Sequence, residues 1–146
     1  MVRTLDGNGT VLLCGNGGSA ADCQHWAGEM VGRFRRERDA YSFVALTTDT
    51  SVITSVANDY DYDSVFSRQV AALGKPGDIL VCLSTSGKSP GILKAAQQAH
   101  NRKMSVVSFT GKGPNPLSET ADHALIVPST DTARTVSYTH LTLPTN

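Results

Sequence analysis

The sequence lacks the features that would indicate a membrane, an oxidising compartment or a nucleic acid. No apolar run approaches the roughly 20 residues that cross a bilayer, and the opening MVRTLDGNGT lacks the long apolar region of a secretory signal. The three cysteines, Cys14, Cys23 and Cys82, match no CxxC spacing, so we expect free thiols. Thirteen basic and thirteen acidic residues leave no net charge and no basic block. We expect a cytoplasmic protein with neither a membrane nor a nucleic acid as partner.

Short apolar runs alternate with segments of helical length along the chain. The runs occupy 10–14, 41–46, 78–83, 104–109 and 123–128, and helical spacing appears at 19–34, 63–73 and 89–101. Each run is near-continuously apolar, which is typical of strands covered on both faces in a parallel sheet. The sequence has no internal repeat, and its turn clusters are too short to link domains. The pattern predicts one doubly wound α/β domain with a parallel sheet.

Two loops between these elements suit an anionic ligand. GNGGS, residues 15–19, follows the first strand, and its glycines let backbone amides approach a ligand at the start of a helix. Its spacing matches neither GxGxxG nor GxxxxGKS, so it favours neither a dinucleotide nor a nucleoside triphosphate. STSGKSP, residues 84–90, gathers four hydroxyls, those of Ser84, Thr85, Ser86 and Ser89. The hydroxyls predict a phosphate site without arginine, although Ser89 before Pro90 also fits a simple helix N-cap.

Two pairs of polar residues near these loops are candidates for chemistry. His25 and Glu29 are four residues apart, so on a helix they share one face, and we expect both near the mouth of the glycine loop. There the carboxylate could act as a general base and share a metal with the imidazole, whereas the alternative is a solvated surface pair. Asn58 and Asp59 could bind sugar hydroxyls, with local helix capping by Asp63 as the alternative.

Several motifs, in order, resemble the phosphoheptose isomerases of the sugar isomerase (SIS) domain superfamily. They are CGNGGSAADCQHWAGEMVGRF, ALTTDTSVITSVANDY, GDILVCLSTSGKSPGILKAA and FTGKG, and the similarity spans roughly residues 9–135. The resemblance implies a three-layer, flavodoxin-like domain with a parallel five-stranded sheet that assembles into a homotetramer. It also implies the interconversion of sedoheptulose 7-phosphate and D-glycero-D-manno-heptose 7-phosphate through an enediolate, which supplies heptose for lipopolysaccharide or related glycans.

The resemblance also assigns roles to individual residues. Glu29 would be the base, and His25 and Glu29 would be two ligands of a zinc ion. The phosphate would be held by Ser84, Thr85, Ser86 and Ser89, and the sugar would contact Asn16, Gly17, Gly18, Ser19, Asn58 and Asp59.

The chain departs from the family pattern near both ends. The family resemblance implies a domain over 1–135 without the family's N-terminal and C-terminal helices. The final SYTHLTLPTN resembles translated sequencing-adapter sequence, so we expect a non-native tail over 136–146. The family's glutamine and later histidine, which complete the zinc site and supply the acid, are replaced here by Val136 and Pro144. We therefore expect impaired isomerase activity from this chain.

Two interpretations from other functional classes share parts of the pattern. Non-catalytic SIS proteins that associate with the replication initiator resemble this chain at GNGGSAA and TTDTSVIT, but they lack a carboxylate at the position of Glu29. A sugar-phosphate-sensing regulatory domain is the other alternative.

Overall fold

Five parallel strands form the centre of the molecule. The computed structural model describes residues 1–129. The strands are β1 (Val11–Gly15), β2 (Phe43–Ala45), β3 (Ile79–Ser84), β4 (Ser105–Thr110) and β5 (His123–Ile126), in the order β2-β1-β3-β4-β5. All four pairings are parallel. This is the flavodoxin-like order, so the expected parallel five-stranded sheet is confirmed.

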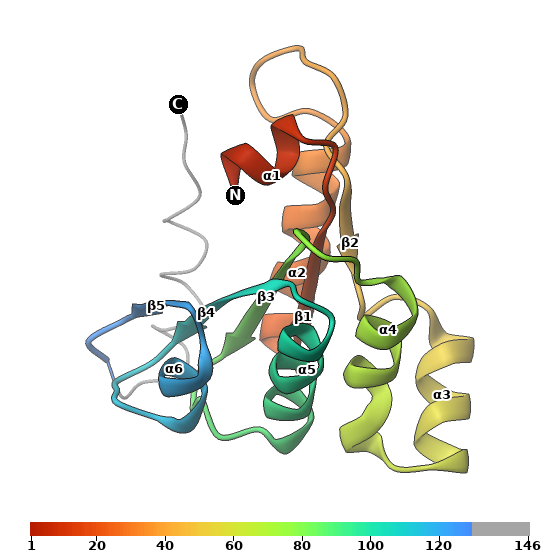
Figure 1. The fold of residues 1–146 in the computed structure, drawn as a ribbon, viewed down its shortest axis with the longest axis vertical. Coiled ribbons are helices and arrows are strands. Elements are labelled where there is room, and N and C mark those ends of the chain that lie inside the picture. Colours follow the sequence, from red (N-terminus) through yellow and green to blue (C-terminus); the bar gives the residue numbers. More distant parts are fainter. Residues whose placement is uncertain (130–146) are drawn as a thin grey trace.

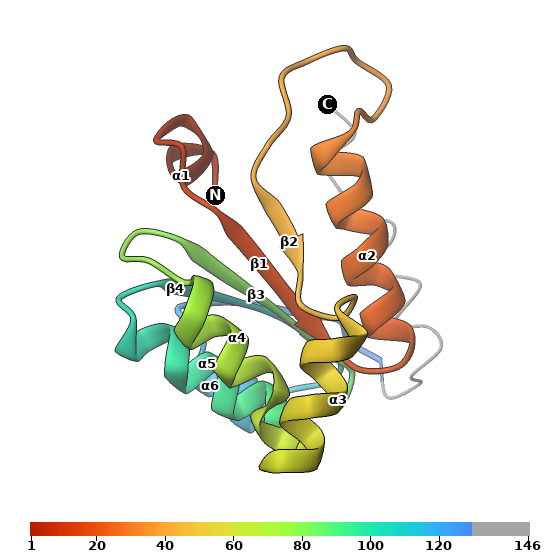
Figure 2. The ribbon, with the colours of Figure 1, turned by 90° about the vertical axis from the view of Figure 1, so that its right-hand side faces the viewer.

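Helices cover both faces of this sheet (Figure 1). They are α1 (Val2–Asp6), α2 (Gly18–Val31), α3 (Thr50–Asp59), α4 (Val65–Leu73), α5 (Pro90–Asn101) and α6 (Pro116–Thr120), with a 3₁₀ turn η1 (Tyr62–Ser64) before α4. Figure 2 shows α2 on one side of the sheet and α4, α5 and α6 on the other. The three expected helices correspond to α2, to η1 with α4, and to α5, and the three-layer arrangement is confirmed.

Each face of the sheet has its own hydrophobic core, because successive side chains of a strand point to opposite faces. Leu12 and Leu80 pack with the helices α4 and α5, whereas Leu13 and Val81 pack with α2. All residues of β1 and β3 are buried, as the continuous apolar runs predict. These two central strands therefore hold the loops that follow them on a rigid base.

Three helices appear where the sequence pattern did not predict them. Helix α3 occupies part of the TTDTSVITSVANDY motif, α6 follows the turn cluster GKGPNP, and α1 precedes the first strand. Helix α2 ends at Val31, three residues before the predicted end, so Phe34 lies beyond the helix. Trp26 is 4% exposed and meets Phe109 edge-on, with 5.2 Å between ring centroids, whereas Phe34 is 39% exposed.

The cysteines are free, as expected, and all three are buried. Cys14 and Cys82 face each other across β1 and β3, with Sγ atoms 3.6 Å apart. This sulfur contact and then burial raise the pKa of Cys14, which disfavours its thiolate. Within residues 1–129 no helix is long and apolar enough to cross a membrane.

Candidate functional site

The two predicted anion loops lie at the same edge of the sheet. The glycine loop follows β1 and the hydroxyl loop follows β3, and these strands are parallel neighbours that pair from Val11↔Ile79 to Gly15↔Leu83. From β1 the chain continues to β2, and from β3 it continues to β4 on the opposite side (Figure 1). Ligands of open α/β sheets bind where the strand order reverses in this way.

A direct contact joins the two loops. Nδ2 of Asn16 donates a hydrogen bond to Oγ of Ser89 at 3.1 Å, although the two residues are 73 positions apart in the chain. The Tyr62 hydroxyl donates to Oδ1 of the same Asn16 at 2.9 Å. The structure thus brings together two predicted site residues and adds Tyr62. Tyr62 follows the predicted Asn58 and Asp59 in the sequence, but no local pattern singles it out.

The glycine loop presents bare backbone at its tip. Gly17 has φ 55° and ψ −122°, a conformation that disfavours residues with a Cβ, and no atom lies within 4 Å of where that Cβ would be. Gly15 must also lack a Cβ, because one would come within 2.9 Å of the Ser19 backbone and side chain. Gly17 and Gly18 are exposed, whereas Ser19 is buried. The tip therefore leaves main-chain atoms open to a ligand.

The helices that begin at these loops have no side-chain caps. Gly17, the N-cap of α2, has no side chain, and the side chain of Ser89, the N-cap of α5, accepts no bond from the first turn. By contrast, Asp49 caps α3 and Asn115 caps α6 through their side chains. Uncapped first-turn amides and the helix dipole favour an anion at both helix starts. The expected N-cap position of Ser89 is confirmed, but its hydroxyl bonds Asn16 instead of its own helix.

The hydroxyls of the second loop act as acceptors. Oγ of Ser84 accepts from the Gly87 amide at 3.1 Å, and Oγ of Ser86 accepts from the Lys88 amide at 3.2 Å. Together with Ser89, they donate to no other group within residues 1–129. A hydroxyl has one hydrogen to donate. Each of the three can therefore accept within the protein and donate to an anion. The fourth residue, Thr85, accepts from the Gly111 amide through its carbonyl at 3.0 Å.

The hydroxyl loop rests on the connection between β4 and α6. Gly87 has φ 63°, and a Cβ at this position would overlap the Asn115 side chain. The Leu117 amide donates to the Gly87 carbonyl at 3.1 Å. Nδ2 of Asn115 in turn donates to Oγ1 of Thr110 at 3.1 Å. Asn115, which is 5% exposed, therefore packs against the hydroxyl loop and holds it on the end of β4.

His25 and Glu29 form the expected pair on one face of α2. Nε2 of His25 lies 3.9 Å from Oε1 of Glu29, with side-chain exposures of 46% and 24%. Arg38 fixes this end of α2, because its guanidinium donates to the carbonyls of Glu29 and Met30 at 2.8 and 2.9 Å.

The position of this pair along α2 differs from the expectation. Because α2 starts at Gly18 and rises about 1.5 Å per residue, Glu29 lies roughly 16 Å along the axis and His25 about 10 Å. Within one chain the pair is therefore not at the mouth of its own glycine loop.

Asn58 and Asp59 occupy the last turn of α3. Nδ2 of Asn58 donates to Oδ1 of Asp59 at 2.9 Å, and both residues are exposed. The capping alternative through Asp63 does not hold, since Ser64 is the N-cap residue of α4. The polar segment adjoins the loops through Tyr62, which bonds Asn16.

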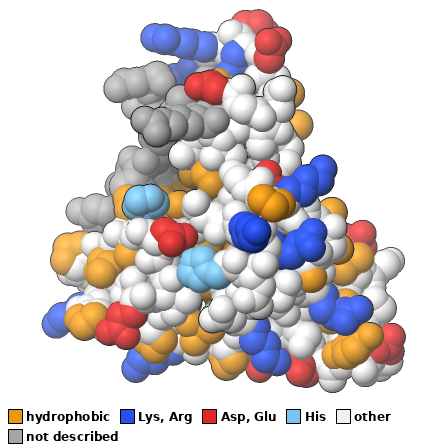
Figure 3. Space-filling view, viewed as in Figure 1, with side chains coloured by type: hydrophobic (Ala, Val, Ile, Leu, Met, Phe, Trp, Pro, Cys, Tyr) orange, Lys and Arg blue, Asp and Glu red, His pale blue; other side chains and the backbone are white. Residues whose placement is uncertain are grey.

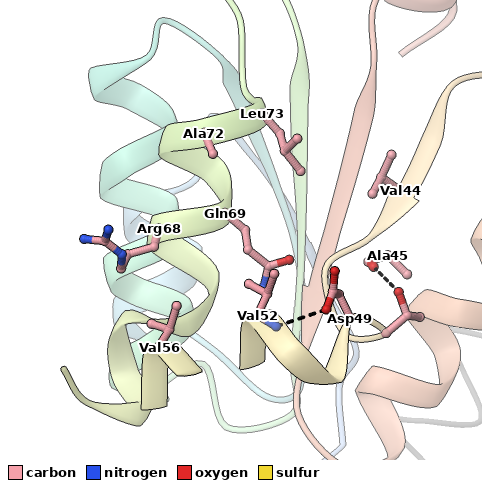
Figure 4. Close-up of a pocket in the computed structure, with 10 residues that line it drawn as sticks. Val44, Ala45, Asp49, Val52, Val56, Arg68, Gln69, Ala72 and Leu73 are labelled. Carbon is pink, nitrogen blue, oxygen red and sulfur yellow. Dashed lines mark hydrogen bonds between the residues drawn. The ribbon is translucent and has the colours of Figure 1, made fainter. Parts of the chain in front are cut away.

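A groove of about 420 Å³ lies elsewhere, between β2, α3 and α4 (Figure 4). Its lining is mainly apolar and includes Val44, Val52, Val56 and Leu73, with Asp49, Arg68 and Gln69 beside them. It contains none of the predicted site residues.

On the face in Figure 3, charged side chains of both signs cover the loop that rises above α2. Neither surface has the hydroxyls and bare amides of the two anion loops.

Comparison with known proteins decides the family. Residues 1–111 match the SIS domain family. A phosphoheptose isomerase from Azoarcus sp. (strain BH72) is 53% identical over 146 residues, which cover 98% of this chain and 74% of that protein. The chain belongs to the phosphoheptose isomerase family of SIS domain proteins. The resemblance seen in the motifs is confirmed.

Solved structures of phosphoheptose isomerases have the same fold. GmhA from Neisseria gonorrhoeae matches with a TM-score of 0.90 and 45% identity, over 97% of this chain and 75% of that one. The enzyme from Francisella tularensis matches with a TM-score of 0.93 and 39% identity, over the same shares. These relatives have enzyme names, which favours the isomerase interpretation over the two non-catalytic alternatives. Val136, Pro144 and the predicted tail over 136–146 lie outside the described residues.

Proposed function

We propose that this chain binds a heptose 7-phosphate and isomerises it between ketose and aldose. The substrate pair would be sedoheptulose 7-phosphate and D-glycero-D-manno-heptose 7-phosphate. The observation that carries the proposal is the Asn16–Ser89 bond, which joins two anion loops at the strand-order reversal of an isomerase-family fold. Membership of the phosphoheptose isomerases supports this choice of sugar.

The phosphate end of the substrate would lie between the starts of α2 and α5. Ser84, Thr85, Ser86 and Ser89 would hold the phosphate with hydroxyl groups and first-turn amides, without a cationic side chain. Asn16, Gly17, Gly18 and Ser19 would contact the sugar from the glycine loop. Asn58 and Asp59, which end α3, would bind sugar hydroxyls.

Glu29 would be the base that moves the proton. It would remove a proton from C1 of the ketose to form an enediolate and return it to C2, while the hydroxyl proton passes from O1 to O2. The reacting carbons and the phosphate are at opposite ends of the seven-carbon chain.

Zinc is the metal that the family resemblance suggests. His25 and Glu29 offer an imidazole nitrogen and a carboxylate oxygen, donor types that zinc prefers, and at 3.9 Å apart both could reach one ion. No group of three or more potential ligands occurs within residues 1–129. The two side chains would therefore hold zinc only as part of a larger ligand set. When bound, zinc would polarise the oxygens of the reacting carbons.

Further proposals concern the intact enzyme. It would be a cytoplasmic homotetramer that supplies heptose for lipopolysaccharide or related glycans, with residues 1–135 of this chain forming its SIS domain. Because Val136 and Pro144 replace the family's glutamine and acid histidine, turnover by this chain would be well below that of a full-length enzyme. Comparable turnover in a coupled isomerase assay would contradict that proposal.

Thermal unfolding with added sedoheptulose 7-phosphate tests the phosphate site. Saturation at about 100 times Kd stabilises a protein by roughly 2.7 kcal/mol, so the wild-type melting temperature should rise by several degrees. Ser86→Ala should reduce this rise, because it removes a hydroxyl of the loop. Ser55→Ala is the control, since Ser55 is exposed on α3 and bonds the Val52 carbonyl instead. Equal ligand responses in all three proteins would exclude the proposed site.

Deuterium exchange at C1 and C2 of the sugar phosphate tests the base. In D₂O the wild-type chain should incorporate solvent deuterium at these carbons, and Glu29→Gln should stop the exchange without weakening phosphate binding. Because turnover by this chain should be low, the exchange should be slow, and wild-type exchange no faster than that of Glu29→Gln would contradict the role of Glu29 as the base.

A further inference from the structure

Tyr62 begins a directed chain of hydrogen bonds that ends at the anion loops. Its hydroxyl donates to Oδ1 of Asn16 at 2.9 Å, and Nδ2 of Asn16 donates to Oγ of Ser89 at 3.1 Å. We infer that Tyr62 is a positioning residue that acts through Asn16 to direct the Ser89 hydroxyl hydrogen at a bound phosphate monoester. The inference rests on the phosphate site proposed above.

The direction of the two bonds carries the argument. The bond from Nδ2 of Asn16 occupies a lone pair of the Ser89 hydroxyl and leaves its hydrogen for the ligand. With the Asn16 amide turned over, Oδ1 would face Ser89 and take that hydrogen. In the orientation that the structure has, Tyr62 donates to Oδ1 while Nδ2 donates to Ser89, so the two bonds together leave the Ser89 hydrogen for the ligand. Successive donors also polarise one another, which makes the last hydroxyl a stronger donor.

The backbone around Tyr62 is held against the helix that follows Ser89. A Cβ at Gly91 would lie 3.3 Å from Cα of Asp63, so the absent side chain lets η1 pack closely on the first turn of α5. Nζ of Lys94, one turn further along α5, lies 3.3 Å from Oδ2 of Asp61. Both flanks of Tyr62 therefore contact α5. Its side chain is 53% exposed, so the hydroxyl can be removed without opening the core.

Calorimetric titration with sedoheptulose 7-phosphate and with inorganic phosphate tests the inference. Tyr62→Phe removes only the hydroxyl, and we expect it to weaken binding of both probes by about three- to tenfold, the value of one hydrogen bond. Tyr60→Phe is the matched control. Tyr60 is 61% exposed in the same segment, but its ring lies over the Arg68 guanidinium at 4.2 Å. Tyr60→Phe should bind as the wild type does, and both variants should keep the unliganded melting temperature.

A double-mutant cycle with Ser89→Ala separates action through Ser89 from a general structural effect. If Tyr62 acts through Ser89, Tyr62→Phe should weaken binding in the wild-type background and cause no further loss beside Ser89→Ala. The inference would be wrong if Tyr62→Phe bound as tightly as wild type, or if Tyr62→Phe and Tyr60→Phe lost the same affinity. Either result would leave the proposed phosphate site unaffected. Failure of the wild-type chain to bind either probe would overturn the proposed phosphate site and the inference with it.

Discussion

Replacing Gly17 by alanine should separate the stability of the fold from its ability to bind a phosphate. At φ 55° and ψ −122°, an alanine costs on the order of 1–3 kcal/mol of unfolding free energy. No further loss is expected, because no atom lies within 4 Å of the new methyl group. Typical domains are stable by about 5–15 kcal/mol, so the variant should still fold. The methyl group would, however, occupy the space through which the loop amides reach a ligand.

Gly77→Ala is the matched control for this change. Gly77 has φ 90° and likewise has no atom within 4 Å of its Cβ position. It lies in the turn before β3, at the edge of the sheet opposite the anion loops. The control should therefore lose stability for the same backbone reason and keep the ligand site.

Urea unfolding with and without sedoheptulose 7-phosphate measures both effects. A ligand at about 100 times its Kd adds roughly 2.7 kcal/mol to the unfolding free energy. We expect this gain in the wild type and in Gly77→Ala, and little or none in Gly17→Ala. If Gly17→Ala kept the full gain, the bare tip of the glycine loop would not be where the ligand binds, and the reasoning would fail.

Three further predictions concern stability. Gly87→Ala should lower the unfolding free energy by about 2–5 kcal/mol, since an unfavourable φ adds to an overlap with Asn115. Urea unfolding measures this loss, and a smaller value would contradict the close packing of Gly87 on Asn115. The Val106 amide and then His100 hold the pKa of Asp122 below its usual range. The stabilisation by the Asp122 carboxylate is therefore present above about pH 4 and lost as the pH falls through the lowered pKa. The difference in unfolding free energy between wild type and Asp122→Asn should shrink in acid. A constant difference between pH 6 and pH 2 would contradict this. Gly28→Ala, inside α2 with free space around the new methyl group, should raise the melting temperature through a gain of about 0.5–1 kcal/mol.

The sequence predicted those elements whose pattern of apolar residues matches their burial in the fold. The continuous apolar runs at 10–14 and 78–83 became fully buried central strands. Helix α3 was missed because TSVITSVAND is rich in β-branched and small polar residues, which have low helix propensity. Its signals were an N-cap at Asp49 and apolar residues at Val52, Ile53 and Val56. Helix α6 had a similar signal in Asn115 before Pro116.

Local patterns predicted the two loops but not the contacts that join them. Each loop is one short segment of the sequence, so its glycines or hydroxyls can be recognised without knowing the fold. The bonds of Asn16 to Ser89 and to Tyr62 span 73 and 46 residues, and no periodicity specifies such a pairing. The distance of Glu29 from the glycine loop follows from where α2 starts.

The missing caps of α2 and α5 give the proposed ligand a structural role. Asp49 supplies α3 with an oxygen for the Val52 amide at 3.0 Å, and nothing equivalent serves the helices that begin at Gly18 and Pro90. A phosphate monoester between them would supply those oxygens to two helices at once. The substrate would thereby complete the secondary structure of the domain, and amide hydrogens at both helix starts should exchange with solvent more slowly once it is bound.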